Sequence, residues 1–240
     1  RFRKEKGVYN SRHPKEIKFI NSIDEDLARR DFTMNALAYS EKTGVIDLYG
    51  GKTDIKNGII RFVGDPNLRI EEDALRIMRA FRFISKLGFS LDKKTADAIY
   101  EKRRFLSKIS KERIFDELSK ILLGPYVKKA LYEMKNLGIF ELIIPEFKYT
   151  YKFKLGDFKN KNNLFYHIVN TVDFCKRDLI TRLSALFHDL GKINTRIIDA
   201  KGNSFYYGHE KESALIAEEK LRQLKASKDI IFSVKNIILN

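Results

Sequence analysis

Cysteine is almost absent from this sequence, which contains 240 residues and a single thiol, Cys175. One cysteine excludes an intramolecular disulfide and fits a protein of the reducing cytosol, so we expect a cytoplasmic location. Long apolar runs are also lacking, since no stretch approaches the roughly 20 residues of a membrane-spanning helix. The sequence contains no recognisable signal peptide, and it therefore predicts neither a secreted nor a membrane-spanning protein.

Acidic residues are scarce as well. The chain has 32 Asp and Glu against 47 Lys and Arg, which gives a formal net charge of +15. Such an excess favours a polyanionic partner, with nucleic acid the first choice and a membrane surface the second. A lysine-rich composition shared by all proteins of the source would give the same charge without such a partner. No initiator Met is present, and residues 1–3 look like the interior of an element, so we expect the natural N-terminus to lie upstream.

Residues 69–83 (RIEEDALRIMRAFRF) contain no Gly or Pro and predict a single helix. One stripe of this helix should face a core, and it consists of Ala74, Ile77, Met78, Phe81 and Ile84. Asp73 and Arg76 are three residues apart and would be neighbours on its surface. The pair offers carboxylate acceptors beside guanidinium donors, which complement the edge of a nucleobase, or it forms an ordinary surface ion pair of little value.

Residues 25–39 are compatible with helical packing, and they contain a charged cluster formed by residues 29–31 close to Asn35. Arginine suits phosphate oxygens, and a carboxylate accepts a hydrogen bond from a ribose hydroxyl. The alternative is a solvated helix turn with local salt bridges. Further expected elements are strands at 17–20, 44–47 and 59–63, helices near 95–100, 110–123 and 127–137, and a linker over 145–163.

Three of the four histidines follow this linker in a helical region. His167, His188 and His209 each lie beside polar or helix-breaking residues, and Asp189 directly follows His188. Imidazole and carboxylate groups are common ligands of divalent metals, so these four residues predict a metal site.

Four segments in this order resemble motifs of the bacterial-type (class II) tRNA nucleotidyltransferases and the related poly(A) polymerases. Residues 29–36 (RRDFTMNA) look like the ribose-recognising motif of that family, and residues 47–51 (DLYGG) look like its hinge between head and neck. Residues 72–76 (EDALR) resemble the motif that selects the incoming nucleotide, and residues 112–118 (ERIFDEL) resemble a neck element that braces the selecting helix. The C-terminal part resembles the HD domain appended to some of these enzymes.

The resemblance implies a role for each candidate residue. Asp73 would accept from the exocyclic amine of cytosine or adenine and Arg76 would donate to the ring nitrogen, while Asp31 would hold the ribose and Arg30 the triphosphate. The nucleotide-binding set implied in this way is Arg30, Asp31, Asn35, Asp73, Arg76 and Arg79. Two Mg²⁺ ions would assist attack of the tRNA 3′ hydroxyl on the α-phosphate of CTP or ATP. In the HD domain, His167, His188, Asp189 and, as a further histidine, His209 would hold a divalent transition metal.

The sequence departs from the family before Arg29. Neither the Gly-Ser loop nor the metal-binding Asp-x-Asp strand of the family is recognisable there, and Asp24-Glu25-Asp26 lies too close to Arg29 to serve. None of the catalytic head carboxylates is therefore expected in this chain, and we expect residues 1–240 alone to add no nucleotide.

The predicted fold is mainly α: the C-terminal remnant of an α/β nucleotidyltransferase head, an all-helical neck and body, and an α-helical HD domain. The expected boundaries are 1–62 for the head, 63–145 for the neck and body, 146–163 for the linker and 164–240 for the HD domain. The expected function is CCA addition to the acceptor stem of tRNA. The alternatives are a metal-dependent phosphohydrolase acting on phosphoesters such as 2′,3′-cyclic phosphates, a poly(A) polymerase, and an RNA-binding remnant without catalysis. The sequence does not define the oligomeric state.

Overall fold

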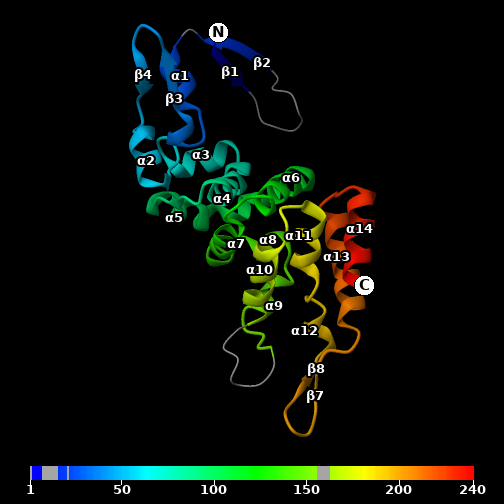
Figure 1. Cartoon of the computed structure of the whole chain (residues 1–240). Coiled ribbons are helices and arrows are strands. Elements are labelled where there is room, and N and C mark those ends of the chain that lie inside the picture. The colour runs from blue at the N-terminus through cyan, green and yellow to red at the C-terminus, as the bar shows by residue number, and fades with distance from the viewer. Residues whose placement is uncertain (1, 7–15, 21, 156–162) are drawn as a thin grey trace.

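The computed structural model describes residues 2–6, 16–20, 22–155 and 163–240, and these residues form an elongated, mainly helical molecule (Figure 1). The strands of the described part form four two-stranded sheets, so the expectation of a mainly α fold is confirmed. Two of these sheets lie at the N-terminal end, next to a central group of helices, and the last helices form the opposite part of the molecule.

Short strands and helices alternate at the N-terminal end. Strand β1 (Phe2–Lys6) pairs antiparallel with β2 (Glu16–Ile20), and β3 (Leu37–Ser40) pairs antiparallel with β4 (Gly44–Asp47). The helical interpretation of residues 25–39 is wrong beyond α1 (Ile23–Ala28), because Phe32 is extended and bridges to Phe62. A single 3₁₀ turn, η1 (Thr33–Asn35), then leads directly into β3.

The last residue of the hinge segment 47–51 begins a helix that the sequence pattern did not indicate. Helix α2 (Gly51–Asn57) starts where the Asp47 carboxylate accepts the backbone N–H groups of Gly51, at 2.7 Å, and Lys52, at 2.9 Å. A Cβ at Gly51 would lie 2.3 Å from the carbonyl oxygen of Thr33, so only glycine fits at this close approach. The strand expected over 59–63 is shorter, because only β5 (Ile59–Ile60) pairs regularly, in parallel with β6 (Ser90–Leu91).

The helix predicted over residues 69–83 is divided in two. Helix α3 (Pro66–Glu72) ends at Asp73, whose backbone is extended, and α4 (Leu75–Leu87) begins two residues later. The Asp73 carboxylate accepts the backbone N–H of Leu75 at 3.1 Å, which satisfies a donor at the start of α4. The apolar stripe is confirmed, since all five of its members, from Ala74 to Ile84, are buried.

The helices expected near 95–100, 110–123 and 127–137 are present as α5 (Lys93–Lys102), α6 (Lys111–Leu122) and α7 (Val127–Asn136). The sequence did not indicate η2 (Arg103–Lys108) or α8 (Phe140–Ile143), and α9 (Phe147–Thr150) lies in the expected linker. The apolar side of α6, which includes Leu118 and Ile121, is buried against α4. Ser110 occupies the N-cap position of α6, but its side chain forms no capping hydrogen bond.

The C-terminal part packs directly on these helices. Its elements are α10 (Leu164–Phe174), α11 (Leu179–Phe187), α12 (Lys192–Thr195), β7 (Ile197–Ile198), β8 (Ser204–Phe205), α13 (His209–Gln223) and α14 (Lys228–Leu239). Arg182 of α11 is buried and donates to the carbonyl oxygens of Leu122 and Gly124 at the end of α6. The predicted linker begins within this packing, since Phe147 of α9 is fully buried between Phe140 and Phe165. The domain boundaries themselves stay predictions.

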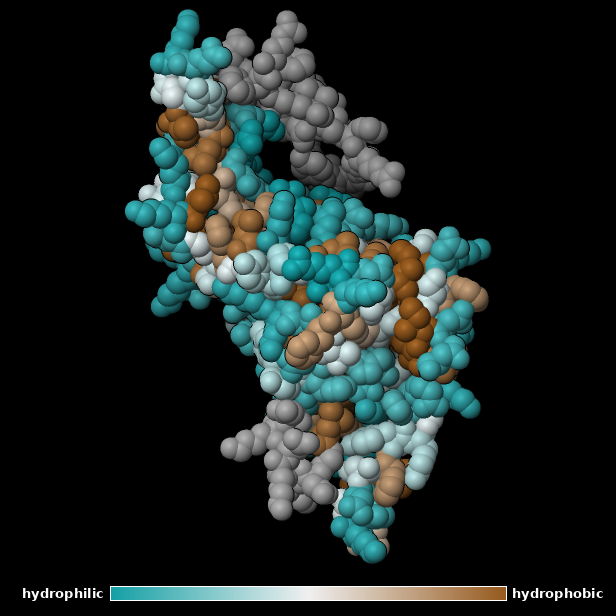
Figure 2. Space-filling model, viewed as in Figure 1, coloured by the Kyte–Doolittle hydropathy of each residue, from teal (hydrophilic) through white to brown (hydrophobic). Residues whose placement is uncertain are grey.

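The surface is mainly hydrophilic on the face shown in Figure 2, and apolar side chains gather there in small patches. One such patch lies over the β3–β4 hairpin, where Tyr39 and Val45 are paired across the strands and exposed. Within the described ranges, every helix is too short or too polar to span a bilayer.

Candidate functional site

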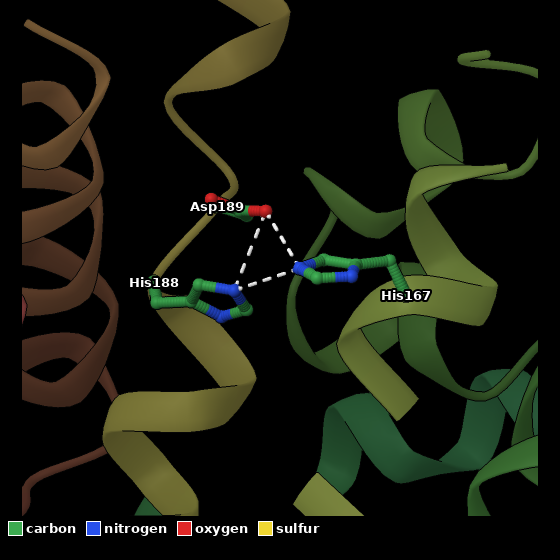
Figure 3. Close-up of side chains that lie close together, drawn as sticks. All are labelled: His167, His188 and Asp189. Carbon is green, nitrogen blue, oxygen red and sulfur yellow. Dashed lines mark hydrogen bonds and ion pairs between the residues drawn. The ribbon is translucent and has the colours of Figure 1, made fainter. Parts of the chain in front are cut away.

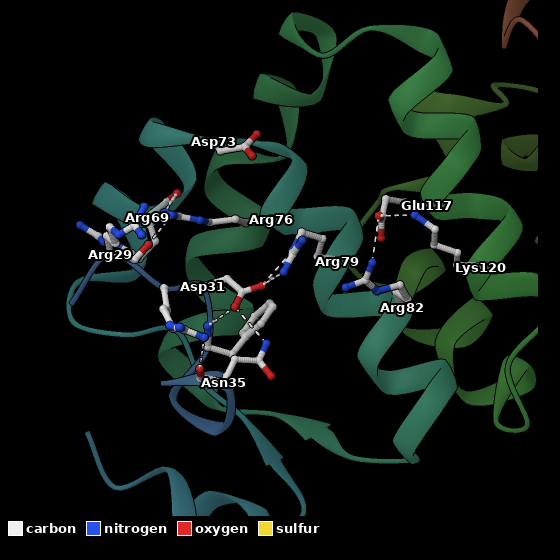
Figure 4. A network of polar contacts seen from close by, with 12 residues as sticks. Arg29, Asp31, Asn35, Arg69, Asp73, Arg76, Arg79, Arg82, Glu117 and Lys120 are labelled. Carbon is white, nitrogen blue, oxygen red and sulfur yellow. Dashed lines mark hydrogen bonds and ion pairs between the residues drawn. The ribbon is translucent and has the colours of Figure 1, made fainter. Parts of the chain in front are cut away.

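A cavity of about 500 Å³ opens between the end of α1 and the junction of α3 with α4. It is lined by Arg29, Arg30, Asp31, Asn35, Asp73, Arg76 and Arg79 (Figure 4). All six residues predicted to bind a nucleotide therefore meet in one place, although they come from two segments about 40 residues apart. Arg29 is the additional lining residue; it belongs to the charged cluster of residues 29–31 but was not among the predicted nucleotide-binding residues.

Asp31 is the central acceptor of the cavity and is buried. Its Oδ1 accepts the backbone N–H of Phe32 at 2.9 Å and the Asn35 amide at 3.0 Å. Its Oδ2 accepts both Nε, at 2.8 Å, and Nη2 of Arg79, which projects from α4 (Figure 4). A carboxylate offers about four acceptor positions, and all four are used here. A ribose hydroxyl could bind Asp31 only by replacing one of these partners.

Arg76 joins three separate elements. Its Nη1 donates to the carbonyl oxygen of Arg69 at 2.8 Å and to Glu72 at 2.7 Å, and its Nη2 donates to the carbonyl oxygen of Arg29 at 2.9 Å. The alternative of a surface ion pair between Asp73 and Arg76 is wrong, because the helix break at Asp73 separates the two side chains and Arg76 pairs with Glu72 instead. Both residues line the cavity without neutralising each other.

Asp73 is held by a residue from a distant segment. Its Oδ2 lies 3.2 Å from Nη2 of Arg113, near the start of α6. The resemblance places Arg113 in the segment that braces the selecting helix, residues 112–118, but it does not indicate the partner of this side chain. No local pattern could indicate this contact, because the two residues are 40 positions apart.

The cavity carries an excess of positive charge, with four arginines and two aspartates among its lining residues. Arg29 and Arg30 both pair with the buried carboxylate of Asp26, at 2.5 and 3.0 Å, which holds them at the cavity edge. Guanidinium groups in such an arrangement suit the oxygens of a polyphosphate. Asp26 itself is engaged by both arginines and is not available as a free metal ligand.

Asp26 gives the protein a pH-dependent contribution to stability. Burial opposes its ionisation, but hydrogen bonds from Arg29 and Arg30 outweigh burial and place the pKa of Asp26 below its ordinary value. This stabilisation is therefore fully present above about pH 4 and is lost as the pH falls through the lowered pKa. We expect urea denaturation between pH 7 and pH 3 to show a steeper acid loss of unfolding free energy for the wild type than for Asp26→Asn. Parallel pH profiles would contradict this assignment.

The second cluster lies between α10 and the end of α11 (Figure 3). Nε2 of His167 lies 3.1 Å from Nε2 of His188, and these atoms are 3.0 and 3.3 Å from Oδ2 of Asp189. Three of the four predicted metal ligands thus have donor atoms close enough to bind one ion. The fourth, His209, lies at the edge of the cluster, with Nε2 3.5 Å from Oδ1 of Asp189.

The donor set of this cluster fits a divalent metal. Nδ1 of His188 lies 2.8 Å from the carbonyl oxygen of Ala185, which only accepts, so Nδ1 carries the proton and Nε2 is left as a ligand. Burial of Asp189 opposes ionisation, but its contacts with His167, His188 and Lys192 outweigh burial and hold the pKa of Asp189 well below its usual range. Lys192 also lies 2.7 Å from Oδ2 of Asp189, so a bound ion would compete with its ammonium group.

Two family models match the chain. The poly(A) polymerase head domain matches residues 1–61, and the probable RNA- and SrmB-binding site of polymerase A matches residues 88–150. The cavity lies between the matched head and the segment that connects it to the second matched region, since its lining residues belong to these two parts of the chain. The fold and the cavity therefore define a class, that of polymerase heads joined to a helical RNA-binding region.

Two similar proteins of known function indicate the family within this class. The CCA-adding enzyme of Anoxybacillus flavithermus is 49% identical over 139 residues, which are 58% of this chain and 35% of the relative. The CCA-adding enzyme of Lactobacillus helveticus is 50% identical over 129 residues, 54% of this chain and 32% of the relative. The chain belongs to the family of bacterial-type tRNA nucleotidyltransferases and poly(A) polymerases, as the motifs at residues 29–36, 47–51, 72–76 and 112–118 predicted.

A solved structure supports the same assignment. The crystal structure of the Bacillus stearothermophilus CCA-adding enzyme in complex with CTP superimposes with a TM-score of 0.59 at 27% identity, over 93% of this chain and 57% of that one. The chain spans about a third of the length of the curated relatives that it matches.

Proposed function

We propose that this chain is the nucleotide-selecting part of a CCA-adding tRNA nucleotidyltransferase and that it binds CTP and ATP in the arginine-rich cavity. The observation that carries this proposal is the meeting of Asp73 and Arg76 at the cavity wall beside the Arg29–Arg30 pair. One wall of the cavity then offers an acceptor, Asp73, and a donor, Arg76, to a nucleobase. The neighbouring edge offers the guanidinium groups of Arg29 and Arg30 to phosphates.

Base selection follows from the donors and acceptors that remain at this wall. In the contacts among the described residues, Arg76 uses three of the five N–H groups of its guanidinium. The Nε–H or one Nη2–H can donate to the ring nitrogen of cytosine or adenine, and the other can donate to O2 of cytosine, while Asp73 accepts from the exocyclic amine. Uracil and guanine present a carbonyl oxygen to Asp73 and leave buried polar groups unpaired, which is costly.

Residues 1–240 are proposed to bind the nucleotide and not to catalyse its transfer to RNA. The resemblance implies two Mg²⁺ ions held by head carboxylates, but Asp24-Glu25-Asp26 is the single Asp-x-Asp sequence in residues 1–240. Asp26 does not fit that task, because Arg29 and Arg30 occupy its carboxylate. Binding of the nucleotide, in contrast, uses residues that are present.

The RNA partner is proposed to be the tRNA acceptor stem, held by the basic surface of η2 and the start of α6. Arg104, Lys108 and Lys111 are exposed there, and Lys108 lies 3.9 Å from the ring centre of Phe105. Three phosphate contacts predict a loss of affinity of about 40-fold between 50 and 200 mM salt. We expect the Arg104→Ala, Lys108→Ala double variant to lower the slope of log affinity against log salt by about two.

Filter binding of an acceptor-stem hairpin at several salt concentrations measures this slope. Lys228→Ala is the matched control, because Lys228 is exposed on α14, outside this surface. An affinity that barely changes with salt, or that falls equally in the control, would rule out this surface as the RNA site.

A second activity is proposed for the histidine–aspartate cluster, because its donor atoms converge as a metal site requires. A bound divalent transition metal would there supply an activated water for hydrolysis of phosphoesters such as 2′,3′-cyclic phosphates. His167, His188 and Asp189 would hold the ion, and His209 would orient Asp189 from its other oxygen.

Removal of one ligand tests this second site. We expect the chain to bind about one equivalent of Mn²⁺ or Co²⁺, and we expect His188→Ala to weaken binding at least about tenfold and to abolish phosphodiesterase activity. Isothermal titration calorimetry measures the binding independently of turnover. Asn194→Ala is the control, since Asn194 is exposed on the adjacent α12 and bonds to Glu212 instead of the cluster. Equal metal affinity in all three proteins would contradict the site.

A further inference from the structure

The hairpin formed by β7 and β8 has two faces with different surroundings. It extends beyond the helices of the C-terminal part (Figure 1). Successive side chains alternate between the faces, and one face carries Tyr206, whose ring centre lies 6.1 Å from that of Phe153. The other face, which we call the outer face, carries the cross-strand pair Ile197 and Phe205 together with Tyr207. These three side chains are 56%, 37% and 73% exposed.

Phe205 and Tyr207 form a pair of nearly parallel rings on the outer face. Their ring centres are 5.7 Å apart and the angle between their planes is 6°, which is an offset stack. Single exposed apolar side chains are ordinary on protein surfaces, but two exposed rings held in parallel offer an extended flat surface. Such a surface can stack an unpaired nucleobase, because every base has a π-face.

The charge of the hairpin favours a polyanionic ligand. Residues 196–208 contain two cationic side chains, Arg196 and Lys201, and one carboxylate, Asp199. The carboxylate accepts the backbone N–H groups of Lys201, at 2.9 Å, and Asn203, at 2.8 Å, so it is engaged within the turn. Lys201 and Arg196 are exposed. Stacking rings flanked by cations are the combination with which proteins bind single-stranded nucleic acid.

The hairpin leads directly into the histidine–aspartate cluster. His209 follows Tyr207 by two residues, and its backbone N–H and its Nδ1 lie 3.1 and 2.8 Å from the carbonyl oxygen of Tyr206. Nε2 of the same ring lies 3.5 Å from Oδ1 of Asp189. A ligand that stacks on the rings and also reaches the cluster needs an aromatic base and a phosphate, and a nucleotide at the end of a strand has both.

We propose that Phe205 and Tyr207 form a stacking site for an unpaired base at the end of a single-stranded RNA. The choice of RNA rests on the proposed hydrolysis of phosphoesters at the neighbouring cluster, whereas stacking itself requires no metal. The site shares no residue with the arginine-rich cavity or with the basic surface of η2 and α6. Bases inside a double helix cover each other's faces, so the site selects unpaired RNA.

Fluorescence titration of the full 240-residue chain with a short single-stranded RNA that contains 2-aminopurine tests this site. The fluorescence of 2-aminopurine falls when the base stacks, and EDTA in the buffer excludes a contribution from metal. We expect the double variant Phe205→Leu, Tyr207→Leu to bind about tenfold more weakly and to lose the quenching, because leucine is apolar but has no π-face. Phe205→Tyr keeps a ring and should retain both.

Tyr39→Leu is the matched control, because Tyr39 is 74% exposed on the separate β3–β4 hairpin and should not affect the titration. His188→Ala should also leave the quenching unchanged. Tyr207→Leu alone alters an exposed ring and leaves the buried core intact. Wild-type affinity in this variant and in the double variant, or equal losses in Tyr39→Leu, would overturn the stacking site. A wild type that quenches the probe but has no phosphodiesterase activity would instead overturn the proposed hydrolysis.

Discussion

Replacing Arg76 with alanine is expected to weaken binding of CTP by about 100-fold, because two hydrogen bonds from a charged donor to the base are lost, and binding of ATP by about tenfold, because one is lost. Arg76→Lys should bind both nucleotides nearly as weakly as Arg76→Ala. A single ammonium group cannot hold the carbonyl oxygens of Arg69 and Arg29 and at the same time donate to a base, whereas the guanidinium fork does so.

The same variant is expected to lower stability, since Arg76 satisfies carbonyl oxygens at the ends of α1 and α3. Arg82→Ala separates the two effects. Arg82 lies on the same helix and forms an ion pair with Glu117 at 3.1 Å, but it is not part of the cavity wall. We expect this control to reduce the unfolding free energy while its CTP affinity stays within about twofold of the wild type. Comparable losses of CTP affinity in both variants would contradict the assignment of Arg76 to the base.

Replacing Asp31 with alanine is expected to lower the free energy of unfolding by about 3 kcal/mol, because it leaves Arg79 without its carboxylate in a partly buried position. The variant also removes the acceptor for Asn35 and for the backbone N–H of Phe32. The affinity for nucleotides should also decrease in this variant, since Arg79 and Asn35, which Asp31 holds in place, both line the cavity. Urea denaturation at pH 7 measures the change.

A double-mutant cycle with Arg79→Met isolates the pair. If the Asp31–Arg79 contact accounts for most of this loss of unfolding free energy, the double variant should be less destabilised than the sum of the single variants by at least about 1 kcal/mol. Arg61→Met is the matched control, because Arg61 forms comparable pairs with Asp54 and Asp92 outside the cavity and should show no coupling to Asp31. A decrease below 1 kcal/mol in Asp31→Ala would show that the buried carboxylate does not organise this wall.

The parts of the fold that the sequence predicted depend on local patterns. The apolar stripe of α4 and the buried side of α6 follow from helical periodicity, and Gly88 ends α4 in the left-handed conformation expected of a terminating glycine. Five of the six candidate nucleotide-binding residues could be chosen because they lie in the short motifs 29–36 and 72–76, and the sixth, Arg79, follows the second motif by three residues. Their roles stay proposals, but their meeting around one cavity is the arrangement that those motifs required.

The parts that the sequence did not predict depend on long-range contacts or on competition between local conformations. The break at Asp73 arises because a short carboxylate binds the backbone N–H of Leu75, which outweighs the helical pattern of residues 69–83. The strand at Leu37–Ser40 forms because β4 is available as its partner. The Arg113–Asp73 and Arg79–Asp31 contacts join residues 40 and 48 positions apart, for which a single sequence has no signal.

Recognition of a nucleobase edge by this cavity can be tested directly by titrating the chain with all four ribonucleoside triphosphates. We expect CTP and ATP to bind at least about tenfold more tightly than UTP and GTP, and we expect Asp73→Asn, which replaces one acceptor oxygen by a donor, to reduce this preference. Equal affinity for the four nucleotides, or a preference that is unchanged in Asp73→Asn, would contradict it.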